Sequence, residues 1–130
     1  MMNKIFVNVP VKDLAVAMDF FAKLDFTFSP QFTNENAACM VISDNIFVML
    51  LTEEFFQASI SKEIANTRET TEMLLALATE SREEVDVFME RVLVAGGSES
   101  REAQDQGFMY SRGFEDLDGH LWEVFYYQTK

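Results

Sequence analysis

The sequence is poor in the residues that build disulfides and metal centres, with one cysteine and one histidine. A single cysteine, Cys39, excludes a disulfide within the chain and any metal motif that needs a cysteine pair. A single histidine, His120, excludes a site built on two histidines of one chain. Cys39 lies in the apolar run Ala37–Ile42, which is typical of a small buried side chain in a reducing cytoplasm.

Basic residues and long apolar runs are also scarce. The chain has 10 basic and 22 acidic residues, a net charge of −12 that repels nucleic acid and anionic lipid. The longest uncharged apolar runs, such as Ile46–Leu51, are six residues long, whereas a membrane helix needs about 20. Asn8, Pro10 and Lys12 interrupt the segment after Lys4, so a signal peptide is not expected. We therefore expect a soluble, cytoplasmic protein that binds neither nucleic acid nor a membrane.

A length of 130 residues, 48% of them hydrophobic, suits one globular domain with a real core. The pattern of predicted elements occurs twice within it. We expect a single domain, 1–130, made of a first module at 1–52, a connecting segment at 53–71 and a second module at 72–130.

Periodicity predicts the elements of the first module. An alternating strand over Lys4–Val11 precedes a helix over Asp13–Leu24, with Asp13 as its N-cap. Three strands follow, bounded by turn residues: Phe26–Phe32, Ala37–Ser43 and Ile46–Thr52. In the connecting segment Phe56, Ile60 and Ile64 recur every four residues and predict a short helix.

The second module repeats this order. A strand over Glu72–Thr79 precedes a helix over Arg82–Ala95, which begins with the capping box of Ser81 and Glu84 and ends at Gly96. Three strands complete it: Ser98–Ala103, Phe108–Arg112 and His120–Tyr127. In the alignment of the two modules Phe6 matches Leu74, Phe20 matches Phe88, and Met49 matches Glu123.

The most distinctive stretch is Phe114–Tyr127, a turn that leads into an apolar strand. The turn, Asp116–Gly119, has the aspartates and glycine that tight turns use. Strand alternation places Glu123 on one face with Leu121 and Phe125. A buried carboxylate there needs a metal, a base or a ligand as partner, whereas on an edge strand it is simply solvated. This strand alone leaves both interpretations open.

The two modules resemble the vicinal oxygen chelate superfamily, which includes glyoxalases, bleomycin-resistance proteins and extradiol dioxygenases. The motifs that carry the resemblance are V-K-D-L at Val11–Leu14 and D-L-D-G-H-L-W-E-V at Asp116–Val124. The resemblance covers the whole chain and is closest to small predicted lactoylglutathione-lyase-like proteins. It implies an α+β fold, in which two tandem β-α-β-β-β modules form a curled mixed sheet around a cleft. It also implies a homodimer, for which 53–71 and Phe125–Tyr127 are candidate surfaces.

The resemblance further implies a divalent metal held by the first and last strand of each module. By position, its ligands would be Phe6, Met49, Leu74 and Glu123. Only Glu123 is a usable ligand, and zinc or iron sites need about three or more. His120 alternates onto the other face of its strand, so we expect it to pack near the turn. We therefore predict no metal and no other cofactor.

Without a metal, the same positions predict an apolar cleft around one carboxylate, a common form of small-molecule site. Tyr110 and Arg112 would reach Glu123 if their shared face lines this cleft. In the alternative, Arg112 only neutralises Glu123 in a sealed structural pair. The predicted ligand-binding residues are Phe6, Asn8, Met49, Leu74, Tyr110, Arg112 and Glu123.

Three functions remain open from the sequence. The first is a metal-free protein of the glyoxalase/bleomycin-resistance type that binds a small molecule, anchored by Glu123. The second is a glyoxalase-like lyase or isomerase with Glu123 as the catalytic general base, in which Asn8, Tyr110 or Arg112 would stabilise an enolate. The third is a non-catalytic interaction module.

Overall fold

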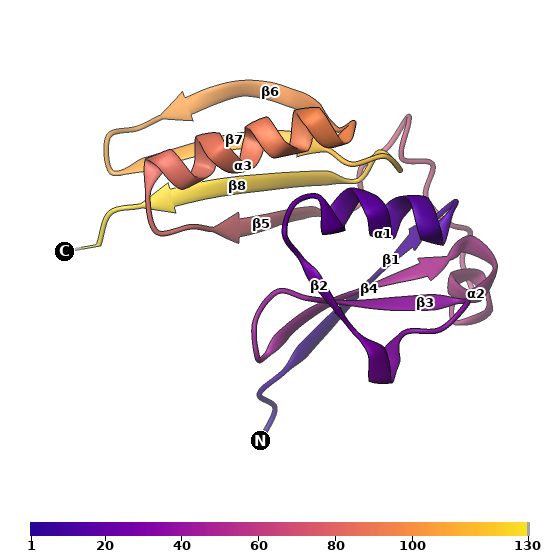
Figure 1. Ribbon diagram of the computed structural model, residues 1–130. Helices are drawn as coiled ribbons and strands as arrows, with labels where there is room; N and C mark the ends of the chain where they lie inside the picture. The colour runs from indigo at the N-terminus through magenta and orange to yellow at the C-terminus, as the bar shows by residue number, and fades with distance from the viewer. Residues whose placement is uncertain (130) are drawn as a thin grey trace. The chain divides into compact units, whose positions relative to one another are not determined.

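The computed structural model describes residues 1–129 and contains two four-stranded mixed sheets (Figure 1). Sheet A has the strand order β1-β4-β3-β2, with β1 parallel to β4 and the other neighbours antiparallel. Helix α1 follows β1 in the chain. The bounds are β1 (Ile5–Val11), α1 (Leu14–Ala22), β2 (Thr27–Ser29), β3 (Ala37–Val41) and β4 (Ile46–Thr52).

Sheet B repeats this topology in the order β5-β8-β7-β6, with β5 parallel to β8. Helix α3 lies along one face of it (Figure 1). The bounds are β5 (Leu74–Ala78), α3 (Arg82–Ala95), β6 (Ser98–Asp105), β7 (Met109–Glu115) and β8 (Leu121–Tyr127). The α+β fold of two tandem β-α-β-β-β modules is thereby confirmed.

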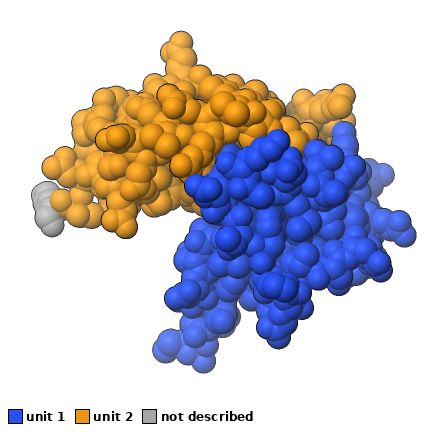
Figure 2. All heavy atoms as spheres, viewed as in Figure 1, with its two compact units in different colours: residues 1–64 blue, residues 65–130 orange. Residues whose placement is uncertain are grey.

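The chain divides into two compact units, one at Met1–Ile64 and one from Ala65 onward (Figure 2). The register of the parallel strands shows that the units are repeats. Asn8 of β1 lies opposite Met49 of β4, and Ala76 of β5 lies opposite Glu123 of β8. The predicted equivalence of Met49 and Glu123 is therefore confirmed. The description of the chain as one domain stays a prediction.

Helix α3 begins and ends where the sequence predicts, and α1 begins after its predicted cap, Asp13, but ends at Ala22, two residues before Leu24. Asp13 accepts a hydrogen bond from the backbone N–H of Val16, and Ser81 accepts one from Glu84. These caps satisfy N–H groups that have no partner inside the helix. Gly96 ends α3 in a left-handed conformation, with φ at 108°, which costs glycine little.

The strand after α1 and the helix of the connecting segment depart most from the prediction. The strand predicted at Phe26–Phe32 ends at Ser29, and a 3-10 turn, η1, follows at Pro30–Phe32, because Pro30 has no N–H for a strand ladder. The helix of the connecting segment is α2 (Glu53–Ala58), capped by Thr52. Ile60 lies outside it, so the four-residue recurrence there is not helical.

Each unit has its own core between helix and sheet. In sheet A, Val9 and Leu50 are fully buried, as is Phe20 of α1. In sheet B, Phe114 stacks on Trp122, and Phe88 of α3 contacts the Phe114 ring. Apolar alternation thus sets which face of each strand meets its helix. Among residues 1–129 no helix is both long and apolar enough to cross a membrane.

Candidate ligand-binding site

The face of sheet B opposite α3, here called the open face, carries Glu123. On β8 Trp122 and Val124 are buried toward α3, while Glu123 alternates onto the other face. The register places Glu123 opposite Ala76 of β5 and opposite Gly113 of β7. Its side chain is 26% exposed, so it is half-buried rather than sealed.

Arg101 of β6 is the partner of Glu123. Its Nη2 donates to Glu123 Oε2 at 2.8 Å and to Ser111 Oγ at 3.1 Å, while Nη1 donates to the Glu102 carbonyl at 3.0 Å. The Arg101 side chain is 27% exposed. A guanidinium–carboxylate contact of this length is a charge-assisted hydrogen bond, among the stronger contacts a protein makes.

A β-bulge directs Arg101 toward Glu123. Glu99 pairs with Phe114 and Arg101 with Gly113, so Ser100 is an extra residue in β6. In a regular strand, Glu99 and Arg101 would lie on the same face and Arg101 would point toward α3. The bulge instead turns Arg101 onto the open face. Gly113 leaves room for the Arg101 side chain, because a Cβ at position 113 would lie 2.5 Å from Ser100 Oγ and 3.2 Å from Arg101 Cγ.

The pair borders a pocket of about 370 Å³ on the open face. Leu74 and Leu121 form an apolar wall, and Glu115 adds a second carboxylate. The pocket therefore combines apolar surface with two acids and one guanidinium, which makes it more polar than the sequence predicted. Its lining residues are Leu74, Ser100, Arg101, Glu115, Leu121, Trp122 and Glu123.

Tyr110 and Arg112 are on the α3 side of the sheet, so the prediction that they reach Glu123 is wrong. Arg112 lies opposite Val124 in the register, one residue from Glu123. It binds Asp86 at 3.0 Å and Glu99 at 3.0 Å, and Tyr110 donates to Asp86 at 2.6 Å. The bond to Asp86 is the largest cause of a raised pKa at Tyr110. The alternative of an Arg112–Glu123 structural pair is wrong for the same reason.

Three predicted residues gather on sheet A, on its face opposite α1. Phe6 stacks on Phe47, with ring centroids 4.6 Å apart, and meets Phe32 edge-on at 6.3 Å. Asn8 donates to the Phe6 carbonyl at 3.1 Å and lies opposite Met49. The structure thus groups Phe6, Asn8 and Met49 in one unit, and Leu74 and Glu123 in the other. That both groups bind one ligand stays a prediction.

Asp116 organises the turn before β8. Its Oδ1 accepts from the N–H groups of Asp118 and His120, and its Oδ2 accepts from Trp122 Nε1 at 3.0 Å. Burial raises the pKa of this carboxyl group, opposed by the nearby His120. Gly119 has a φ of 83°, and Thr67 donates to the Asp118 carbonyl at 2.6 Å. These residues hold the turn in shape, which agrees with the predicted packing of His120 near it.

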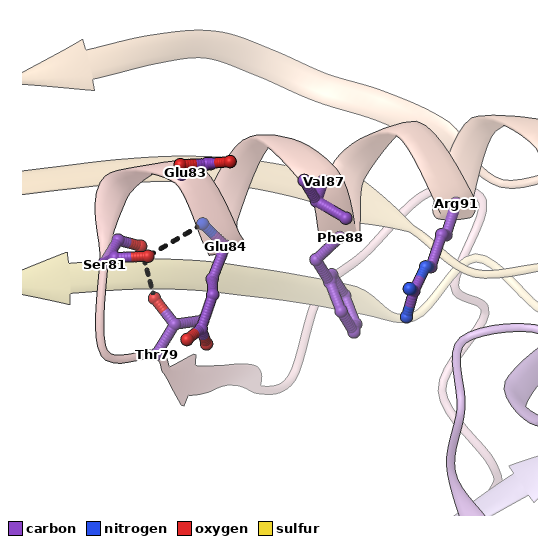
Figure 3. Close-up of a pocket in the computed structure, with 7 residues that line it drawn as sticks. All are labelled: Thr79, Ser81, Glu83, Glu84, Val87, Phe88 and Arg91. Carbon is purple, nitrogen blue, oxygen red and sulfur yellow. Dashed lines mark hydrogen bonds between the residues drawn. The ribbon is translucent and has the colours of Figure 1, made fainter.

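A second pocket, of about 380 Å³, lies along the flank of α3 (Figure 3). Its hydroxyls already have structural partners: Ser81 caps Glu84, and Thr79 donates to the Ser81 carbonyl at 2.9 Å. Phe88 and Arg91 point to the same side of α3 (Figure 3), and Phe88 packs on Phe114. Its charged lining residues are Glu83, Glu84 and Arg91.

Residues 5–124 match the sequence model of the Glyoxalase/Bleomycin resistance protein/Dioxygenase superfamily. The chain belongs to this superfamily. Its motif strand β8 and its repeated topology thus have the same origin as those of the other members, and the resemblance predicted from the sequence is confirmed. Among curated proteins, none matches this sequence.

Solved structures of other proteins share the fold over nearly the whole chain. A hypothetical protein from S. aureus is 29% identical, with a TM-score of 0.81 over 97% of this chain and 95% of that one. A fosfomycin resistance protein from Listeria monocytogenes is 20% identical, with a TM-score of 0.69 over 97% and 93%. A lactoylglutathione lyase from Agrobacterium tumefaciens is 13% identical, with a TM-score of 0.71 over 94% and 91%. At 20% and 13% identity the last two show the fold alone.

The residues at the four positions of the superfamily's metal site do not fit a divalent ion. Phe6 and Leu74 have no donor atom, and the thioether of Met49 is a poor ligand for zinc or iron. Glu123 is ion-paired with a guanidinium, whose charge repels a cation. Within residues 1–129 no three His, Cys, Asp or Glu side chains lie close enough to share a metal.

Proposed function

We propose that this protein binds a small organic ligand without a metal ion, on the open face of sheet B, with Glu123 as the polar anchor. The observation that carries the proposal is the placement of Glu123. Its side chain is about a quarter exposed at a pocket with an apolar wall, and only one of its oxygens is engaged by Arg101. A few convergent polar groups beside apolar surface are the usual form of a ligand site.

The test compares Glu123→Gln with Glu90→Gln, an exposed control on α3. Compounds from a small-molecule library that stabilise the wild-type protein against heat should lose about tenfold in affinity in Glu123→Gln, because a charge-assisted contact is lost. They should bind Glu90→Gln normally. Elemental analysis of purified protein should find no stoichiometric zinc, nickel, iron or manganese. The proposal fails if no compound distinguishes the two variants, or if a stoichiometric metal disappears with Glu123.

A second candidate function is proton transfer at a carbon next to a carbonyl, of the glyoxalase-like lyase or isomerase type. Arg101 favours it, because a guanidinium beside Glu123 supplies the positive charge that an enolate needs. One oxygen of Glu123 is already engaged by Arg101, so we rank this function second. Cleavage of lactoylglutathione by metal-free wild-type protein, lost in both Glu123→Gln and Arg101→Met, would reverse this order.

We also propose that the protein is a cytoplasmic homodimer. Its one thiol, Cys39, is fully buried, and burial raises its pKa, which suits a reducing compartment. Phe55 in the connecting segment is 43% exposed and Tyr127 in β8 is 48% exposed. Both belong to the surfaces expected to pair.

A further inference from the structure

Some hydrogen-bonding groups of the Arg101–Glu123 pair have no partner among residues 1–129. A guanidinium has five N–H donors, and those of Arg101 meet three acceptors, on Glu102, Ser111 and Glu123. Two N–H groups of Arg101 and Oε1 of Glu123 thus have no hydrogen-bond partner within residues 1–129. Both side chains are about a quarter exposed at the same pocket. The pair therefore presents a donor edge and an acceptor edge to a ligand.

The pair is held in place before any ligand arrives. The bulge at Ser100 sets the direction of Arg101, Gly113 gives it space, and Ser111, which is 5% exposed, fixes its Nη2. A receptor whose side chains are already ordered loses less entropy on binding. This arrangement distinguishes the pair from the flexible ion pairs of an open surface.

The surrounding charges and shape restrict the ligand. Glu115 lies on the same face, diagonal to Glu123 across β7 and β8, a spacing of about 7–8 Å between such neighbours. Two carboxylates against one guanidinium disfavour a ligand with only negative charge. A simple amine satisfies Glu123 and Glu115 but leaves the Arg101 donors unused. Beside these groups, Leu74 and Leu121 offer apolar contact.

We propose that the pair recognises the head group of a free α-amino acid with an apolar side chain. The ligand's carboxylate accepts hydrogen bonds from Arg101, its ammonium group donates to Glu123, and its side chain packs on Leu74 and Leu121. The inference rests on the proposed function and names the class of ligand for that site.

Three matched compounds test the inference by calorimetry and NMR titration: leucine, its amine counterpart 3-methylbutylamine, and its acid counterpart 4-methylpentanoate. Leucine should bind at least about tenfold more tightly than either counterpart, because each lacks one charged contact. In Arg101→Met, leucine should no longer bind more tightly than the amine. In Glu123→Gln, leucine should no longer bind more tightly than the acid. Arg68→Met, a change at an exposed site, should alter neither.

Two further variants test the placement of the pair. Arg101→Lys keeps the charge but loses the planar fork, so its affinity for leucine should lie between those of wild type and Arg101→Met. Gly113→Ala places a methyl group against the Arg101 side chain, so it should lower the affinity for leucine more than the affinity for the amine. The inference is overturned if either counterpart binds as tightly as leucine, or if leucine shifts no signal of Arg101 or Glu123. Library compounds that still depend on Glu123 would then leave the proposed function standing.

Discussion

Glu123 forms its ion pair with Arg101, and the coupling free energy of this pair is measurable. In a double-mutant cycle with Arg101→Met and Glu123→Gln, we expect a coupling free energy of about 0.5–1 kcal/mol, because the pair is half-buried and partly screened by solvent. The same cycle with Arg112→Met should give no coupling beyond experimental error, because Arg112 faces α3. Urea denaturation measures both. Equal couplings would contradict the assigned partner.

Asp116 stabilises the turn by accepting from three donors, one of which is the indole N–H of Trp122. Asp116→Asn keeps one acceptor oxygen but sets an amide N–H₂ group against that indole donor. A buried donor without an acceptor costs about 1–3 kcal/mol of unfolding free energy, which urea denaturation should report. Asp44→Asn, in an exposed turn, is the control and should change little. A loss of equal size in both variants would show that the turn's network is not the cause.

At the scale of elements, the start of α3 is tied to the β6–β7 hairpin. Arg82 donates to both carboxylate oxygens of Asp105 at 2.8 Å, and this contact is the largest cause of a lowered pKa at Asp105. A lowered pKa in the folded state means that unfolding takes up a proton at acidic pH. The contact therefore stabilises the fold above the ordinary aspartate pKa and loses its effect as the pH falls.

Asp105→Asn tests this linkage. The difference in unfolding free energy between wild type and Asp105→Asn should be largest near neutral pH and should shrink below about pH 4, the ordinary aspartate range. Asp44→Asn should show no such pH dependence. A difference that grows on acidification would contradict the assignment of Asp105 as a stabilising carboxylate.

At the scale of the whole molecule, the proposed homodimer is tested by its mass in solution. Light scattering coupled to size exclusion should give a mass of two 14.9 kDa chains. Phe55→Ser and Tyr127→Ser, in the two surfaces expected to pair, should shift the protein toward the monomer, because exposed aromatic surface favours association. Val94→Ser, at an 89% exposed residue outside those surfaces, should leave the mass unchanged. A monomeric wild-type protein would overturn the dimer proposal.

The sequence by itself determined the elements and their repetition. Apolar alternation, the caps at Asp13 and Ser81 and the stop at Gly96 are local signals, so the order of helices and strands followed from them. The place of Glu123 on one strand face with Leu121 and Phe125 also followed, because a carboxylate in an apolar strand is visible without a structure.

Only the tertiary structure decided which residues meet Glu123. The turn at Asp116 pairs that residue with His120 and so places Gly113, not Arg112, opposite Glu123. A shift of one residue in register moves every side chain to the other face, and the sequence pattern of β7 does not specify that register. The sequence also did not predict Arg101 as the partner, because the bulge at Ser100 places Arg101 on the face opposite to the one that strand alternation predicts. Register and bulges depend on pairing between strands, and a single strand's sequence does not contain that information.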